Sequence, residues 1–275
     1  MTTSLSPAVE FGIEHARAVL AGKRLCVLTG AGISTDSGIP DYRGAGRVAR
    51  HPLTFDEFMG SEQNRVRYWA RSFVGWSRVA LANPNQGHFA LAKSAQVENL
   101  ITQNVDGLHQ RAGSKSVLEL HGRLDRVICT GCGEILSRSE FDARIANLNP
   151  NVPREQNVEF TPDGDAEVEV GQNFRVPNCA GCGSHFKPDV VFFGEQVPTA
   201  RVETAGRWVS EAEGLLIAGT SLTVNSGLRL VKAAKKLNLP IVIVNLGETR
   251  ADLLADVKLN ASTSEVLELM ELILR

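Results

Sequence analysis

The chain has 275 residues, a formal net charge of −2 and 43% hydrophobic residues, enough to bury a substantial core. Lysine and arginine are spread thinly along it, which argues against a general nucleic-acid binder. No apolar stretch approaches the roughly 18 residues of a membrane span and the first residues resemble no export or transit signal, so we expect a cytoplasmic protein without direct nucleic-acid or membrane contacts.

The first predicted elements are a helix, a strand and a glycine-containing turn. Apolar residues recur at helical spacing over 8–20, and the apolar run over 24–29 is typical of a buried parallel strand. Gly30 and Gly32 follow directly, and glycine lets a turn approach a ligand closely. The N–H groups at the start of the helix expected next favour an anion such as a pyrophosphate, so a dinucleotide is the leading candidate ligand.

This turn departs from the dehydrogenase fingerprint. Thr35 stands where the third glycine of G-x-G-x-x-G belongs, and the run Gly38-Ile39-Pro40-Asp41-Tyr42-Arg43-Gly44 breaks the helical pattern early. A Gly-x-Gly pair also fits a bare turn that binds nothing, and at this point both interpretations stay open.

Later apolar runs alternate with helical stretches. Such alternation predicts an α/β fold, with a Rossmann-like, doubly wound parallel sheet covered on both faces. The further predicted strands lie at 97–102, 116–120, 214–218 and 240–245, and a helix over 226–237 separates the last two.

Four of the five cysteines form two tight pairs. Cys129 and Cys132 enclose two residues, as do Cys179 and Cys182, and a glycine follows each pair. Together they offer four thiolates to one tetrahedral zinc ion. A catalytic zinc keeps a coordination position open, so four thiolates predict one structural Zn²⁺. Free or redox-active cysteines are the alternative, and Cys26 stands apart in an apolar strand.

Two segments interrupt the alternation of strands and helices. Residues 42–92 are helical in pattern, with Trp69, Phe73 and Trp76 on one face, while the cysteine pairs flank a loop-like or hairpin-like insert. We expect both segments to form a smaller lobe, with a binding cleft between the lobes. The expected division is 1–41, 93–124 and 189–275 for the Rossmann-like domain, 42–92 for a helical module of the small lobe, and 125–188 for its zinc-binding module.

Polar residues follow two of the predicted strands. Asn104 and Asp106 come after the second, at the edge where α/β proteins bind ligands, although turn chemistry is an alternative role for both. His121 ends the third strand and is the best general-base candidate, because an imidazole with a pKa near neutrality can accept a hydroxyl proton. Packing is the alternative role for His121, and His109 is its rival as a base.

With these residues in view, the chain closely resembles the sirtuins, the NAD-dependent protein lysine deacylases. The resemblance spans nearly the whole chain and includes both cysteine pairs. Its other motifs are Gly30-Ala31-Gly32-Ile33-Ser34, Gly38 to Arg43, Thr102 to His109, Leu120-His121-Gly122, Lys187 to Glu195, Gly219-Thr220-Ser221 and Val244-Asn245-Leu246-Gly247. The resemblance is sharpest to the class II branch, through Arg67 to Arg71, Phe73 to Trp76, Pro162-Asp163-Gly164-Asp165 and Thr249 to Asp252.

The resemblance implies a reaction in which NAD is consumed as a co-substrate. The acyl oxygen of a modified lysine attacks the ribose C1′, nicotinamide leaves, and water finally releases free lysine and O-acyl-ADP-ribose. His121 would deprotonate a ribose hydroxyl, and Asn104 and Asp106 would position the ribose and nicotinamide ends. The residues implied to hold NAD are Gly30, Ala31, Gly32, Asp41, Tyr42, Arg43, Gln103, Asn104, Asp106, Gly219, Thr220, Ser221, Asn245, Leu246, Gly247 and Thr263.

The implied partners are acylated lysine side chains of proteins. A substrate peptide would add as a strand to Val190, Val191, Phe192, Phe193, Gly194 and Glu195. Tyr68 and Arg71 form a Tyr-x-x-Arg pair like the one with which some sirtuins bind the carboxylate of a succinyl-type acyl chain. In the alternative interpretation, both lie on the outside of a helix or cap a loop.

Two rival functions use the same features. One is mono-ADP-ribosyl transfer to proteins from the same NAD site, which the identity of the product distinguishes from deacylation. The other is a zinc-stabilised NAD-binding scaffold without turnover, and the presence of His121, Asn104 and Asp106 argues against it.

Overall fold

A six-stranded parallel sheet forms the centre of the larger lobe. The computed structural model describes residues 6–42, 52–152 and 173–271, and within them the strand order is β3-β2-β1-β7-β8-β9. The strands are β1 (Leu25–Thr29), β2 (Val97–Thr102), β3 (Val117–Glu119), β7 (Gly214–Ala218), β8 (Ile241–Val244) and β9 (Val257–Leu259). The sheet confirms the predicted α/β fold. β9 was not predicted, because a three-residue strand leaves almost no periodic pattern.

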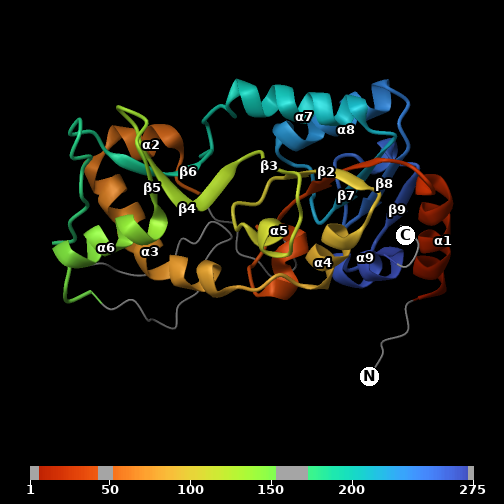
Figure 1. Cartoon of the computed structure of the whole chain (residues 1–275), viewed down its shortest axis with the longest axis horizontal. Coiled ribbons are helices and arrows are strands. Elements are labelled where there is room, and N and C mark those ends of the chain that lie inside the picture. Colours follow the sequence, from red (N-terminus) through yellow and green to blue (C-terminus); the bar gives the residue numbers. More distant parts are fainter. Residues whose placement is uncertain (1–5, 43–51, 153–172, 272–275) are drawn as a thin grey trace.

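Helices cover both faces of this sheet, as Figure 1 shows. Alternate residues of β1 enter different cores: Leu25 and Val27 join one apolar cluster, whereas Cys26 and Leu28 join the other. The first face is covered by α1 (Pro7–Leu20), α4 (Gln86–Lys93) and α9 (Thr263–Glu271), and the second by α7 (Thr199–Glu211) and α8 (Asn225–Lys236). The predicted first helix is confirmed as α1.

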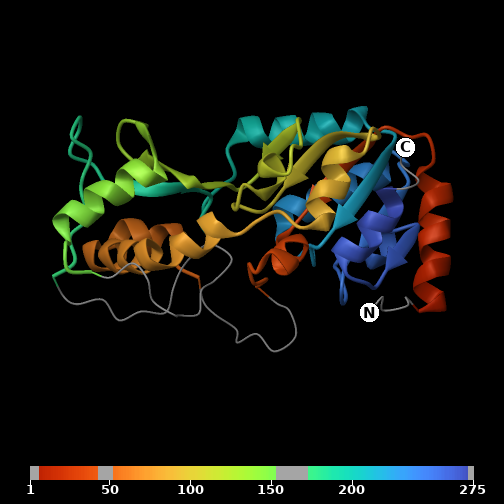
Figure 2. The same ribbon diagram turned by 60° about the horizontal axis from the view of Figure 1, so that its bottom comes forward.

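The smaller lobe joins a three-stranded antiparallel sheet to three helices. Its elements are α2 (Phe55–Gly60), α3 (Glu62–Leu81), β4 (Gly122–Cys129), β5 (Ile135–Ser137), α6 (Arg138–Leu148) and β6 (Phe186–Val190). Trp69 of α3 packs against Phe141 of α6, with ring centroids 4.5 Å apart, and donates from Nε1 to the carbonyl of Phe186. Figures 1 and 2 show this lobe at the end of the molecule away from both termini.

A buried arginine fastens α6 to α3. Arg138 is 1% exposed, and its Nε donates to Asp142 over 2.7 Å while Nη2 donates to the carbonyl of Ser72. The guanidinium lies 5.2 Å from the ring centroids of both Trp69 and Trp76, which favours cation–π attraction. The helical segment and the zinc-binding segment therefore form one packed lobe.

One helix of the expected helical module lies elsewhere. Ala90 and Leu91 of α4 pack in the core of the large sheet, together with Val266 and Leu267 of α9. The sequence pattern predicted the helix but not its packing partner, because an amphipathic pattern shows that one face is buried without showing which element covers it.

Ion pairs surround the point where the chain crosses between the lobes. Arg126 of β4 pairs with Asp189 of β6 over 2.7 Å, and Arg201 of α7 reaches the same carboxylate. Arg123 pairs with Glu119 at the end of β3. The small lobe is therefore connected to the large one through β4 and β6, at a junction stabilised by these ion pairs. No helix among the described residues is long and apolar enough to span a bilayer.

Candidate functional site

A cavity of about 1130 Å³ opens at the carboxyl edge of the parallel sheet. This exceeds the roughly 300–1,000 Å³ of common ligand pockets, which leaves room for a dinucleotide beside a second substrate. Small-lobe residues Leu53 and Tyr68 also line it. The predicted site residues in its wall are Gly30, Ala31, Gly32, Asp41, Tyr42, Tyr68, Gln103, Asn104, Asp106, His121, Val190, Val191, Phe192, Phe193, Gly194, Glu195, Gly219, Thr220, Ser221, Asn245, Leu246 and Gly247.

Two of the predicted site residues that the structure describes are not in this wall. Arg71, half-buried on α3, does not line the cavity, and Thr263, at the start of α9, lies behind the glycine turn. Thr263 donates from Oγ1 to the carbonyl of Gly32 over 3.4 Å. Arg43 lies outside the described residues, as does the class II stretch Pro162-Asp163-Gly164-Asp165.

The glycine turn is held by backbone contact with the loop after β7. The N–H of Gly32 donates to the carbonyl of Gly219 over 2.8 Å, and Gly219 has φ +65°. A Cβ on Gly219 would lie 2.7 Å from the carbonyl carbon of Gly32, so two glycines are needed for this approach. The helix expected after the turn is a seven-residue 3₁₀ helix, η1 (Ala31–Ser37). The N–H of Gly32 is therefore used within the protein, and the prediction that the turn binds a phosphate rests on the other N–H groups at the start of η1.

Asn104 and Asp106 form a buried network with Ser34. Asn104 donates from Nδ2 to the carbonyl of Gly30 and to Ser34 Oγ, each over 3.1 Å. Ser34 in turn donates to Asp106 Oδ2 over 2.7 Å, and Asp106 Oδ1 accepts from the N–H of Leu108. Burial raises the pKa of Asp106, and these hydrogen bonds oppose the shift. The two side chains thus hold their loop, the alternative role in the sequence analysis, while also lining the cavity.

His121 has the protonation pattern of a general base. Its Nδ1 lies 3.1 Å from the carbonyl oxygen of Gln103, which can only accept, so Nδ1 carries the proton. Nε2 therefore offers a lone pair, and it lies 2.8 Å from Ser226 Oγ. Burial lowers the pKa of His121, the hydrogen bond to the Gln103 carbonyl opposes this shift, and the nearby charge of Arg201 adds to it. The ring is thus kept neutral at the cavity wall.

His109 lies in a different environment. It is 1% exposed, its Nε2 lies 2.9 Å from Thr29 Oγ1, and its ring centroid lies 4.8 Å from that of His88. Burial lowers the pKa of both rings. His109 does not line the cavity, so of the two rival histidines only His121 can meet a ligand there.

The segment after β6 is fixed by its own side chains. Phe192 donates its N–H to Glu195 Oε2 over 2.9 Å, and Lys187 Nζ donates to the same oxygen over 3.1 Å. Burial lowers the pKa of Lys187, which the Glu195 carboxylate opposes. Phe193 is already paired with Thr54 in an isolated parallel bridge, in which its carbonyl accepts from the N–H of Phe55 over 2.9 Å. Within the part of the chain that the structure describes, the N–H of Gly194 has no hydrogen-bond partner, so this donor is available to an added strand.

Aromatic rings form the small-lobe side of the cavity. Tyr68 lies 5.4 Å from the ring centroid of Phe192 and 5.5 Å from that of Phe58, in edge-to-face geometry in both cases. Tyr68 is 6% exposed, so this wall is apolar around a phenol group.

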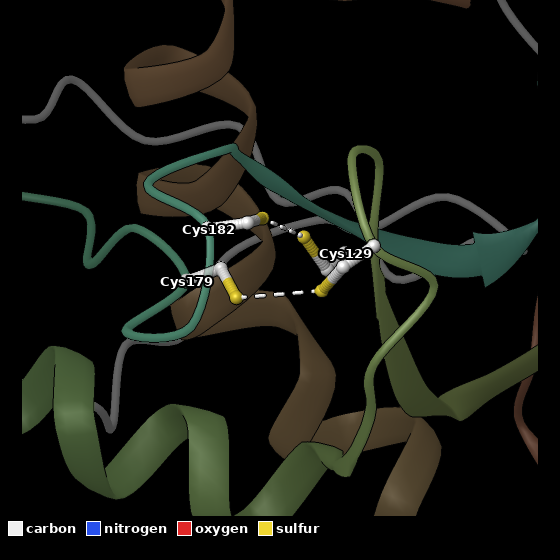
Figure 3. A group of neighbouring side chains, drawn as sticks. Cys129, Cys179 and Cys182 are labelled. Carbon is white, nitrogen blue, oxygen red and sulfur yellow. Dashed lines mark hydrogen bonds between the residues drawn. The ribbon is translucent and has the colours of Figure 1, made fainter.

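The four paired cysteines meet at one point. Figure 3 shows the sulfurs of the two loops facing each other. Cys129 and Cys182 have sulfurs 3.4 Å apart, those of Cys132 and Cys179 are 3.7 Å apart, and all four lie within 4.8 Å of one another. A tetrahedral site with Zn–S bonds of about 2.3 Å requires sulfurs about 3.8 Å apart. The tetrad therefore fits a structural zinc ion.

Several residues that line the cavity were not predicted as site residues from the sequence. Ser34 stood inside a recognised motif but was not assigned a role, and its place between Asn104 and Asp106 depends on the folded loops. Ser226 and Arg229 belong to a helix that was predicted only as the connection between two strands, and no motif marks them. Only the register of α8 reveals that they face the cavity.

The chain is similar to known proteins of one family. The model of the Sir2 family matches residues 30–226. The NAD-dependent protein deacetylase 1 of Mycobacterium avium (strain 104) is 49% identical over 260 residues, covering 92% of each chain. The human mitochondrial NAD-dependent protein lipoamidase sirtuin-4 is 45% identical, covering 94% of this chain and 85% of its own. A solved structure of Sir2 with a p53 peptide and NAD⁺ is 31% identical with a TM-score of 0.76, covering 94% of this chain and 96% of that one.

Proposed function

The chain belongs to the Sir2 family and is an NAD-dependent protein deacylase; from this premise we propose which of its residues carry the reaction. The observation that carries the proposal is the neutral His121 ring, with the Nε2 lone pair at the cavity wall beside Asn104 and Asp106. Bound NAD would supply the ribose hydroxyls and the nicotinamide leaving group. His121 takes the proton of a ribose hydroxyl at Nε2, and the Gln103 carbonyl stabilises the resulting imidazolium through Nδ1–H.

The NAD-binding residues are proposed from their place in the cavity. Asn104 and Asp106 hold the loop that faces the ribose and nicotinamide ends, and the loops after β1, β7 and β8 supply the remaining wall. Gly32, whose N–H donates to the Gly219 carbonyl, shapes this wall, and the proposed phosphate contacts come from the other N–H groups at the start of η1. Thr263 is proposed to support the glycine turn from behind, through its hydrogen bond to the Gly32 carbonyl. Arg43 is still proposed to bind NAD.

An acylated lysine peptide is proposed to lie along the segment after β6. Its backbone would pair with this segment, including the N–H of Gly194, while Lys187 and Glu195 hold the turn from Phe192 to Glu195 in place. The acyl chain would enter between Phe192 and Tyr68. Acetylated peptides are the first class to test, since the Mycobacterium avium relative is a protein deacetylase.

Assignment to the class II branch is a finer proposal. It is supported by the stretches quoted for that branch and by 45% identity to human sirtuin-4. The domain division at 1–41, 93–124, 189–275, 42–92 and 125–188 also stays a proposal, and β4 and β6 each cross one of its boundaries.

Preference for acidic acyl groups rests on Tyr68 and Arg71. Tyr68 lines the cavity, and Arg71 would have to turn into it to meet a carboxylate. The idea is abandoned if Arg71→Met leaves succinyl and glutaryl turnover unchanged relative to acetyl.

Mass spectrometry of acyl-lysine peptides tests the proposed function. Acetyl, succinyl, hydroxymethylglutaryl and lipoyl peptides are incubated with NAD and with either the parent chain or His121→Tyr. NAD-dependent loss of the acyl group, absent in the variant, is the expected result and ranks the acyl groups. ADP-ribose on protein without deacylation would instead support mono-ADP-ribosyl transfer, and unchanged NAD would support the scaffold.

A further inference from the structure

A serine that no motif marks contacts the proposed base. Ser226 lies in the first turn of α8, lines the cavity and places its Oγ 2.8 Å from Nε2 of His121. The N-cap residue of α8 is Val224, which makes no side-chain capping hydrogen bond. Among the described residues, the partner of the Ser226 hydroxyl is the imidazole of His121.

The two hydrogen bonds of His121 together fix the orientation of the ring. Gln103 accepts from Nδ1 on one edge, and Ser226 donates to Nε2 on another. A half-turn of the ring would exchange both nitrogens for carbons, so the Gln103 carbonyl and the Ser226 hydroxyl would each face a C–H group. Losing both hydrogen bonds makes the flipped ring unfavourable.

The backbone around Ser226 is itself held in place. A Cβ on Gly227 would lie 2.8 Å from Oε1 of Gln103, so α8 packs directly on that side chain. Gln103 donates from Nε2 to the Thr29 carbonyl and to Thr220 Oγ1. Arg250 donates to the carbonyl of Thr223, in the loop that leads into α8. The position of Ser226 is therefore set by the sheet edge and does not depend on the small lobe.

A single lone pair accepts one strong hydrogen bond at a time. A sugar hydroxyl that approaches Nε2 must take the place of Ser226 Oγ, and the serine side chain can rotate away because its backbone stays fixed. We propose that Ser226 is a positioning residue for His121, which holds the ring in the base-competent orientation until a substrate hydroxyl replaces the serine hydroxyl. Only the identity of that hydroxyl, on the ribose of NAD, rests on the proposed function.

Steady-state kinetics test the role in turnover. Ser226→Ala should lower kcat about fivefold, or about 1 kcal/mol at 1.4 kcal/mol per factor of ten, because part of the ring population is misoriented. KM for NAD should stay within twofold. Ser226→Thr, which keeps the hydroxyl, should restore kcat, and Ser210→Ala on the exposed face of α7 is the matched control. A raised KM for NAD with unchanged kcat would overturn the proposal and make Ser226 a simple ligand contact.

Nitrogen NMR of the ligand-free protein tests the contact without any turnover. With ¹⁵N-labelled histidine, His121 should show a protonated Nδ1 and an unprotonated, hydrogen-bonded Nε2. Ser226→Ala should shift the Nε2 signal and Ser226→Thr should restore it. Unchanged His121 signals in Ser226→Ala would overturn the proposal even if deacylation is confirmed. If the parent chain lacks deacylase activity, the proposed function fails while this measurement still decides the contact.

Discussion

Gly122, directly after His121, is a sharp test of how the small lobe is joined to the proposed base. It has φ +87°, and a Cβ built on it would overlap the carbonyl oxygen of Asp189 and lie 2.9 Å from the carbonyl carbon. Gly122 pairs with Val190 where β4 meets β6. An added methyl group therefore forces these two strands apart at the lobe junction.

The expected cost of Gly122→Ala has two parts. The left-handed conformation costs a residue with a Cβ about 1–2 kcal/mol. Relief of the overlap with backbone costs about 1–3 kcal/mol more, so the free energy of unfolding should fall by roughly 2–5 kcal/mol. Because the His121 carbonyl accepts from the Val191 N–H over 2.8 Å, the shift also displaces His121. Deacylase kcat should then fall roughly 10- to 100-fold.

Urea unfolding separates the two parts through a matched glycine. Gly113 has φ +97°, and a Cβ there would meet nothing within 4 Å. Gly113→Ala should therefore show the conformational cost alone, about 1–2 kcal/mol, with normal activity. If the two variants lose equal stability, the steric argument at the junction is wrong. If Gly122→Ala is destabilised but fully active, the link from Gly122 to His121 is wrong.

Three further predictions concern stability, substrate binding and the metal. Burial lowers the pKa of His88 to about 4 and also lowers that of His109, whereas in the unfolded chain both histidines bind a proton near pH 6.5. The free energy of unfolding should therefore decrease as the pH falls through 6.5, and His88 alone should account for a loss of about 2 kcal/mol at pH 5. Equal urea midpoints at pH 7.5 and 5 would contradict this. Lys187→Met removes the cation beside Glu195 and should raise the peptide KM at least about fivefold with NAD KM unchanged, whereas Lys187→Arg should stay near the parent value. Cys179→Ser should lower both the zinc content by atomic absorption and the melting temperature, and full zinc retention would count against the tetrad.

The parts of the fold that were predictable are those that rest on local sequence. β1 is buried on both faces, so its sequence is a continuous apolar run that predicts a buried strand. Each cysteine pair is separated by two residues within one loop, so the local sequence alone predicts the metal ligands. The place of α4 was not predictable, because the partner of Ala90 and Leu91 is α9, near the other end of the chain. The hydrogen bond of the Gly32 N–H was not predictable for the same reason, because its acceptor, the carbonyl of Gly219, lies on a loop distant in sequence.

The choice between His121 and His109 shows the same limit at the site. Both follow predicted strands, and both are neutral because burial lowers their pKa. Residue type and titration therefore do not separate them. What separates them is the partner of each nitrogen: His109 faces Thr29 inside the core, whereas His121 turns its lone pair toward the cavity and a hydroxyl of Ser226. Base chemistry here depends on where the lone pair points, which the sheet edge and the first turn of α8 decide together.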